Sequence, residues 1–249
     1  MTRSCALLCC ALTLIGCTPS RFATVPMDTI DDLLPGAPGE RVLLVMLPGA
    51  YDVPQDFVTH GFIETVRERA LPIDVVAVDS HAGYFTSHTI VDRLHQDVVV
   101  RARSRGYQSI WFLGISLGGY GSLLYAMDHA QELAGIIVLA PYLGTRGVIA
   151  EIEHDGGLAG WVPGEVAADD HERRLLVWLK QSRSADAKRP PIYLGYGADD
   201  RFAAAHRMLA ARLPPEQVWV LPGGHDWPTW KALWDAMLDA GLLARVRQR

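Results

Sequence analysis

The sequence predicts an α/β protein built on a mostly parallel sheet with helices on both faces. Short apolar runs of strand type alternate along the chain with segments of helical spacing, and the runs carry almost no polar interruptions. Uninterrupted runs are typical of parallel strands that are buried on both faces, and the alternation is typical of βαβ units. The composition, 49% hydrophobic and 20% charged over 249 residues, is that of a globular chain with one domain or at most two.

The strands follow from the apolar runs. The first, "RVLLVMLP", is an apolar run without polar interruption, the second is "IDVVAVD", and the later runs resemble them. The six expected strands cover residues 41–48, 73–79, 109–115, 135–141, 190–197 and 217–222.

The helices follow from the spacing of apolar residues between the strands. In 53–70 they recur at helical intervals, 89–106 ends at a glycine suited to a helix C-terminus, and 117–130 follows the third strand directly. A closing amphipathic helix is expected over 227–246. Residues 143–190 separate the fourth and fifth strands, with a helix candidate over 165–182, and we interpret this insertion as a small cap over a site.

The N-terminal region carries all four cysteines, Cys5, Cys9, Cys10 and Cys17. None follows, so the folded body has no disulfide framework, cysteine cluster or cysteine nucleophile. A basic Arg3 and an apolar run over 6–15 suit an export signal. An ordinary cleaved signal and an apolar N-terminal helix are the alternatives.

The segment Leu14-Ile15-Gly16-Cys17 resembles the lipobox of bacterial lipoproteins. The resemblance implies a signal peptide over 1–16, acylation of Cys17 and attachment to a membrane surface. Thr18 is similar to the outer-membrane sorting pattern, which would place the protein on the periplasmic side of that membrane in a host that has one. Residues 17–40, with four prolines, are then expected to be a tether, and 41–249 the folded domain. A short strand near 22–25 would raise the strand count to seven.

The charge and the residue spacing indicate which classes of partner and cofactor to expect. The formal net charge is -5, which gives no indication of a nucleic-acid partner. No cofactor is indicated, and the oligomeric state is left open. No metal site is expected, because the histidines and acids near His225 lack metal-ligand spacing such as H-x-x-H.

The stretch "GISLG", residues 114–118, fits the G-x-S-x-G nucleophile elbow. Ser116 would turn sharply between a strand and a helix, and its neighbours Gly114 and Gly118 would permit that turn. The motif alone is a weak signal, because a glycine-rich turn could also serve only to pack a helix on the sheet. Its strand–turn–helix context strengthens it.

Two further segments supply the partners that a serine nucleophile needs. "GADDRF" follows the fifth strand and "GGHDW" follows the sixth, so an acid and a histidine lie at the same sheet edge as Ser116. With this Ser…Asp…His order, the chain from about Arg41 to its end resembles the α/β-hydrolase superfamily. The resemblance implies Ser116 as nucleophile, His225 as general base and Asp200 as the acid, with Asp199 as the alternative.

The resemblance also implies an oxyanion hole of two backbone N–H groups. One would come from Leu117, and the other from the loop "LPGAYD", residues 47–52, through Ala50 or Tyr51. Pro48 stands where relatives often carry histidine. This departure keeps a backbone donor but leaves its position open.

Aromatic residues are expected around this site, and no cluster of basic residues accompanies them. The predicted substrate-binding residues are Tyr51, Tyr84, Tyr142 and Trp227. Such a lining favours a small uncharged ester. The sequence therefore predicts a serine esterase, with an acyltransferase or peptidase on the same fold, or a non-catalytic membrane-anchored binding module, as alternatives.

Overall fold

The computed structural model describes residues 21–36, 41–181 and 189–244. The predicted signal peptide over 1–16 and the predicted lipid anchor at Cys17 lie outside these residues. Within them, no helix combines the length and the apolar character that crossing a bilayer requires.

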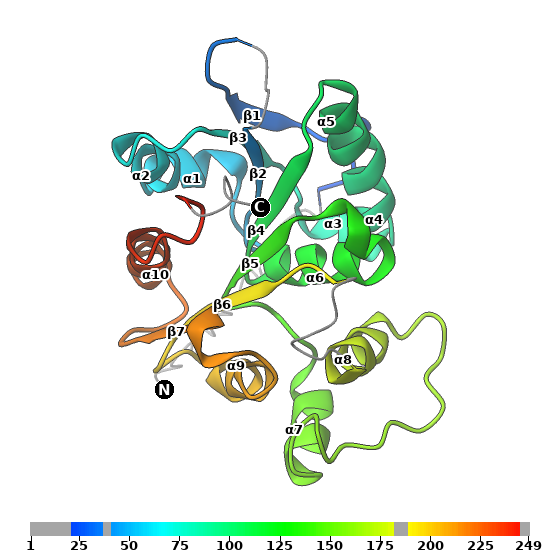
Figure 1. Ribbon diagram of the computed structural model, residues 1–249. Coiled ribbons are helices and arrows are strands. Elements are labelled where there is room, and N and C mark those ends of the chain that lie inside the picture. The colour runs from blue at the N-terminus through cyan, green and yellow to red at the C-terminus, as the bar shows by residue number, and fades with distance from the viewer. Residues whose placement is uncertain (1–20, 37–40, 182–188, 245–249) are drawn as a thin grey trace, which may run out of the picture.

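Seven strands of the described chain form one mostly parallel sheet, which confirms the predicted fold class (Figure 1). Their order across the sheet is β1-β3-β2-β4-β5-β6-β7, and only β1 runs antiparallel to its neighbour. The strands are β1 (Thr29–Asp32), β2 (Val42–Leu47), β3 (Ile73–Val78), β4 (Ser109–Ile115), β5 (Gly135–Leu139), β6 (Ile192–Gly197) and β7 (Val218–Leu221).

Helices cover both faces of the sheet (Figure 1). One face carries α1 (Pro54–Thr59), α2 (Phe62–Glu68) and α10 (Trp227–Asp239). The other carries α3 (Ala82–Thr86), α4 (Ile90–Arg93), the π-helix η1 (Leu94–Val99), α5 (Val100–Ser104), α6 (Leu117–His129), the 3₁₀-helix η2 (Ala130–Glu132) and α9 (Ala203–Ala210). The insertion between β5 and β6, which we call the cap after its predicted role, holds α7 (Arg146–His154) and α8 (His171–Gln181). The short η3 (Pro215–Gln217) precedes β7.

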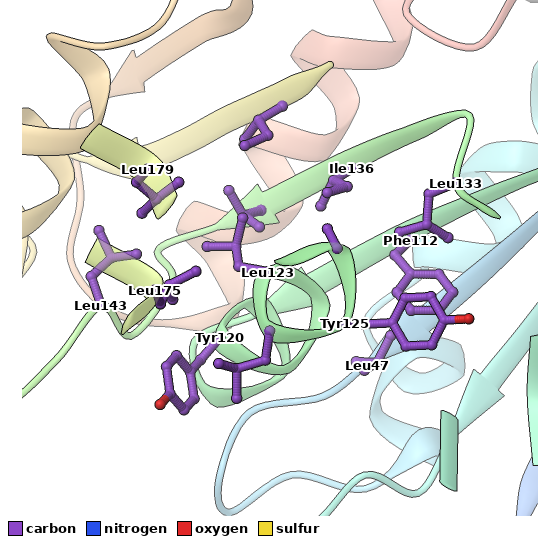
Figure 2. Close-up of a cluster of buried hydrophobic side chains, with 14 of the residues drawn as sticks. Leu47, Phe112, Tyr120, Leu123, Tyr125, Leu133, Ile136, Leu143, Leu175 and Leu179 are labelled. Atoms are coloured by element: carbon purple, nitrogen blue, oxygen red, sulfur yellow. The ribbon is translucent and has the colours of Figure 1, made fainter. Parts of the chain in front are cut away.

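The alternation of side chains along each central strand divides the core in two. In β2, Val45 and Leu47 pack with α6, whereas Leu44 and Met46 pack with the helices of the opposite face. Both sets are fully buried, because successive strand residues point to opposite faces and each face is covered. Figure 2 shows part of the first cluster, where Leu123 and Tyr125 of α6 lie over Phe112 and Ile136 of the sheet.

The N-terminal segment differs from the tether that the sequence predicts. The extra strand lies at Thr29–Asp32 rather than near 22–25, and it pairs with β3. Met27 is buried and its N–H donates to Asp97 Oδ2 at 3.1 Å. The sequence of β1 is polar for a strand, and its conformation depends on pairing with β3, which local patterns do not reveal.

The helices predicted over 53–70, 165–182 and 227–246 are shorter in the structure. The second is α8, His171–Gln181, and glycines explain the other two differences. The helix expected over 53–70 is divided into α1 and α2 by Gly61, whose φ of 72° turns the chain and brings Phe57 against Phe62 at 5.4 Å between ring centroids. The closing helix ends at Asp239 rather than at 246. Gly241, at φ 79°, and the bond from Leu242 N–H to Met237 O end it in the manner of a Schellman motif.

Candidate active site

Ser116 lies at the turn from β4 into α6, at the carboxyl edge of the sheet. Its backbone has φ 50° and ψ -111°, a conformation that residues with a side chain rarely adopt. Three backbone bonds hold it there: its N–H donates to Leu139 O at 2.9 Å, and its carbonyl accepts from Tyr120 N–H at 3.1 Å and Tyr142 N–H at 2.9 Å.

The neighbouring glycines are required by close backbone contacts. A side chain on Gly114 would overlap the carbonyl of Gly118, and one on Gly118 would overlap the carbonyl of Leu47. The start of α6 therefore packs directly against the ends of β4 and β2. In the sheet, β3 lies on one side of β2 and β4 lies on its other side, so the strand order reverses between β2 and β4. Open α/β sheets bind ligands at the carboxyl ends of the strands at such a point.

His225 and Asp200 lie beside Ser116, although they follow β7 and β6. His225 Nε2 is 3.0 Å from Ser116 Oγ, and His225 Nδ1 is 2.8 Å from Asp200 Oδ2. These distances correspond to an imidazole that donates from Nδ1 to the carboxylate and accepts at Nε2 from the hydroxyl. Asp199 is exposed and faces Gly223 instead, at 3.4 Å from its N–H.

The Asp200 carboxylate is held in its charged form inside the protein. Burial by itself raises the pKa of this side chain, which is 0% exposed. Hydrogen bonds from His225 and from the Phe202 N–H, at 2.8 Å, outweigh that effect, so the pKa lies below its usual value. The carboxylate can therefore orient His225 and stabilise its protonated form.

Aromatic rings enclose the imidazole of His225. Phe202 and Trp230 contact it edge to face, with centroid distances of 5.1 and 5.0 Å. The Arg201 guanidinium lies over the Phe202 ring, 4.9 Å from its centroid. These rings limit the orientations that are open to His225.

The loop after β2 lies against Ser116. A Cβ on Gly49 would be 3.7 Å from Ser116 Cβ, so the N–H groups of Ala50 and Tyr51 belong to the same corner as the start of α6. At the first position of α6, the Leu117 N–H has no acceptor within its own helix.

Asp52 fixes this loop, and sequence reasoning missed it. It accepts a bond from Trp227 Nε1 at 3.1 Å, and so connects the loop to the residue that starts α10, two positions after His225. Burial raises the pKa of the Asp52 carboxyl, against the opposing effect of that bond. The available signal in the sequence was the position of Asp52, three residues after Gly49 in the loop that follows a predicted strand.

The four predicted substrate-binding residues differ in their exposure and in their contacts. Tyr51 is 91% exposed, and Trp227 is partly buried and stacks on His60 with 4.4 Å between centroids. Tyr142 is partly buried, and its hydroxyl donates to Glu172 Oε1 of the cap helix α8 at 2.5 Å. The prediction for Tyr84 is corrected: it is 0% exposed and its hydroxyl bonds to Thr24 O at 3.0 Å, so it packs the N-terminal segment onto the domain.

His206 is a second buried residue that the sequence did not single out. It lies in α9 behind Asp200, with Nε2 at 3.1 Å from Pro141 O. Burial lowers its pKa to about 4, so the ring is neutral at pH 7. His206 Nε2 faces Pro141 O, and the donors to the Asp200 carboxylate are His225 and the Phe202 N–H.

A groove of about 350 Å³ lies under the cap, away from these residues. It is lined by Met127, Pro163, Gly164, Val166, Arg174, Val177, Trp178 and Gln181. None of them was predicted as a site residue.

Comparisons with known proteins agree with this architecture. The model of the esterase family, described as "Putative esterase", matches residues 80–240, a stretch that includes Ser116, Asp200 and His225. An acetyl esterase of Caldicellulosiruptor saccharolyticus is 28% identical over 131 residues, which are 47% of this chain and 48% of that protein. The chain thus aligns with about half the length of this curated relative.

Solved structures share the fold at low identity. Est1E from Butyrivibrio proteoclasticus has a TM-score of 0.59 at 18% identity, over 89% of this chain and 95% of that one. The S-formylglutathione hydrolase of Staphylococcus aureus has a TM-score of 0.58 at 16% identity, over 81% of each chain. At such identities the likeness establishes the α/β-hydrolase fold.

Proposed function

Because the chain belongs to the esterase family, we propose that it hydrolyses carboxylic esters with Ser116 as nucleophile, His225 as general base and Asp200 as the acid that orients it. One observation carries the proposal: the hydrogen-bonded series from Ser116 Oγ through His225 to Asp200, at 3.0 and 2.8 Å. Such a series makes an unreactive alcohol nucleophilic at neutral pH.

In the acylation half of the reaction, His225 accepts the proton of the Ser116 hydroxyl. Ser116 Oγ attacks the ester carbonyl carbon while its proton passes to His225 Nε2, and the carbonyl oxygen becomes an oxyanion. The tetrahedral intermediate then collapses, the bond to the alkoxy oxygen breaks, and His225 returns the proton to the departing alcohol. The Asp200 carboxylate stabilises the imidazolium during both transfers.

Deacylation repeats the same path with water. His225 Nε2 takes a proton from the water, whose oxygen attacks the acyl carbon of the Ser116 ester. Collapse of the second intermediate restores the serine hydroxyl and releases the carboxylic acid. The N–H of Leu117 and that of Ala50 or Tyr51 are the proposed donors to the oxyanion in both halves.

The charges around the site favour a small uncharged ester. Asp52 lies on the loop after β2, which packs against Ser116, and Glu172 contacts Tyr142, whose own N–H is bonded to Ser116 O. Two carboxylates at these places would repel a substrate with an anionic acyl group. An acetyl ester is the first candidate, by analogy with the acetyl esterase relative.

The test combines labelling and turnover. A fluorophosphonate should label the wild-type protein at Ser116, and p-nitrophenyl acetate should be hydrolysed faster than longer p-nitrophenyl esters. Ser116→Ala should lose the label and reduce kcat by about 10⁴-fold or more, because residual rates then rest on binding and oxyanion donors alone.

Asp199→Asn serves as the matched control for Asp200→Asn. The first should leave the rate nearly unchanged, whereas the second should lower kcat strongly by favouring the wrong imidazole tautomer. Labelling without ester turnover would indicate an acyltransferase or peptidase. Absence of any adduct on a folded wild-type chain would rule out the serine mechanism.

We also propose that the protein is exported and held at a bacterial membrane through acylated Cys17. Arg3, the apolar run over 6–15 and the segment Leu14–Cys17 support this. Labelled palmitate fed to cells should enter the wild-type chain and not Cys17→Ser, which should also keep its signal peptide. Equal labelling of both chains would contradict the proposal.

A further inference from the structure

Two histidines and a glutamate lie together far from Ser116. His95 belongs to the π-helix η1, His129 is the last residue of α6, and Glu132 is the last residue of η2. One donor atom from each lies within 4.8 Å of the others. Ser116 precedes the 13 residues of α6 and His129 ends them, so the cluster is about 20 Å from the nucleophile at a rise of about 1.5 Å per residue.

The distances between donor atoms are close to those of a coordination shell. His95 Nδ1 is 3.2 Å from Glu132 Oε2, and His129 Nδ1 is 3.8 Å from Glu132 Oε1. In a tetrahedral zinc site with bonds of about 2.05 Å, neighbouring ligand atoms are separated by roughly 3.3 Å. The carboxylate oxygens thus already face both imidazole nitrogens at nearly the required spacing.

The two imidazoles need a modest rotation to share an ion. Their rings are stacked, with 4.5 Å between centroids and 12° between planes, whereas the lone pairs of two ligands of one ion must converge. Rotation about χ2, a torsion with broad preferences in histidine, supplies this. Both side chains are 24–28% exposed, which leaves them room to turn.

A tyrosine supports the carboxylate from inside the protein. Tyr125 donates its hydroxyl to Glu132 Oε2 and lies 3.2 Å from His95 Nδ1. Its ring packs on Phe112 at 5.0 Å, so the hydroxyl is held at the outer end of a rigid side chain (Figure 2). A hydrogen bond of this kind orients a metal-binding carboxylate.

No lysine or arginine side chain of the described chain pairs with the Glu132 carboxylate, whose ion-pair partners there are His95 and His129. The nearby Arg103 directs its guanidinium to the backbone carbonyls of Tyr107, Gln108 and Glu132, not to the Glu132 side chain. The positive charge that would complete the cluster can therefore come from a bound ion.

We propose that His95, His129 and Glu132 bind a divalent transition-metal ion, with Zn²⁺ as the preferred probe. Two imidazoles and one carboxylate suit zinc, and water would complete its shell. The ion would connect η1 to the ends of α6 and η2, and so stabilise the packing of these helices. It would take no part in ester hydrolysis, given its distance from Ser116.

The test is a titration with Zn²⁺ on the full chain in which Cys5, Cys9, Cys10 and Cys17 are changed to serine, since their thiolates would bind zinc themselves. Calorimetry should find one equivalent bound at this site, and Zn²⁺ should raise Tm. Glu132→Gln and His129→Ala should each weaken binding at least tenfold and lose the Tm shift, and Tyr125→Phe should weaken it about tenfold.

His154→Ala is the control, because His154 is exposed on α7 in the cap. It should bind zinc as the parent does. Circular dichroism establishes that each variant is folded, and Glu132→Gln preserves the side-chain shape. Absence of saturable binding, or equal binding by the parent, Glu132→Gln and His129→Ala, would overturn the proposal. Ester hydrolysis is measured separately on the same proteins, so the two proposals can fail independently.

Discussion

At the residue scale, the candidate site depends on how burial acts on individual ionisable groups. Asp200 and His206 are both buried near Pro141 and His225, yet they respond in opposite ways. Asp200 accepts bonds from His225 and Phe202 and stays charged, whereas His206 has no hydrogen-bond partner at Nδ1 in the described chain and stays neutral. Burial penalises the charged form of both groups; the hydrogen bonds to Asp200 outweigh that penalty, whereas the contacts of His206 do not.

His206 should make the fold sensitive to acid. Its pKa is about 4 in the folded protein, against about 6.5 in an unfolded chain. Between these values the unfolded chain binds more protons, so stability falls as the pH falls from about 6.5 towards 4. We expect the loss from pH 7 to pH 4.5 to be about 2 kcal/mol larger in the wild type than in His206→Gln, measured by urea unfolding.

Stability at pH 7 serves as the control for His206→Gln. The side-chain amide that His206→Gln introduces can still donate to Pro141 O, so both proteins should unfold cooperatively at pH 7. Identical losses of stability on acidification would mean that the pKa of His206 does not differ between the folded and unfolded protein, contrary to the expectation.

At the element scale, three close contacts build the corner around Ser116. The turn from β4 to α6 folds back on itself at Gly114, α6 meets the end of β2 at Gly118, and Gly119 meets Pro141 after β5. The ends of three neighbouring strands thus converge on one turn. This closeness brings the loop after β2 next to Ser116, which follows β4.

Gly118→Ala should therefore damage both folding and activity. Its methyl group would overlap the backbone carbonyls of Leu47 and Pro48, which cannot move without shifting β2. We expect a loss of about 2 kcal/mol or more in the free energy of unfolding and a loss of ester hydrolysis. Chemical denaturation and p-nitrophenyl acetate turnover measure the two effects.

Gly147→Ala is the matched substitution. It lies in α7, and a methyl group there meets no atom within 4 Å. It should be neutral or stabilise by up to about 1 kcal/mol, since alanine is the better helix former. A Gly118→Ala protein as stable and active as Gly147→Ala would show that the close packing of β2 on α6 is unnecessary.

At the scale of the whole molecule, the N-terminal segment is part of the fold. Arg21 pairs with Asp79, Met27 is buried, and β1 covers the edge of β3. An uncovered edge strand is open to pairing with other chains. The segment thus protects the sheet.

Asp74 holds this segment to the domain. Its buried carboxylate accepts from Leu34 N–H at 2.7 Å, Arg41 Nε at 2.9 Å and the Tyr107 hydroxyl at 2.6 Å. Burial, together with the bond to Asp74, raises the pKa of Tyr107 to about 12. Asp74→Ala would leave these three donors unpaired, and we expect it to reduce the free energy of unfolding by about 3 kcal/mol.

Asp92→Ala is the control, because Asp92 is exposed on α4. It should change stability by less than about 0.5 kcal/mol in the same denaturation experiment. Equal stability of the two variants would contradict the anchoring role of Asp74.

The cap is connected to the site through the backbone of the loop that follows β5. The Tyr142 N–H donates to Ser116 O, and its hydroxyl donates to one carboxylate oxygen of Glu172 in α8. The other oxygen of Glu172 accepts from Thr145 N–H at 2.9 Å.

The sequence predicts an insertion over 143–190 with a helix near 165–182. Before that helix it predicts a loop with one short helical turn at most, whereas the structure has α7, nine residues whose apolar side chains pack on the shared core.

The alternating elements, the parallel sheet and the turn at Ser116 can be predicted from local patterns: apolar runs, helical spacing and glycines beside a serine. Other features appear only in the folded chain: the aspartate that contacts His225, the pairing of β1, the burial of Tyr84 beside Thr24, and the positions of Asp52 and His95. These depend on contacts between residues far apart in the chain. Such contacts arise when elements pack in three dimensions, and neighbouring positions in the sequence carry little information about them.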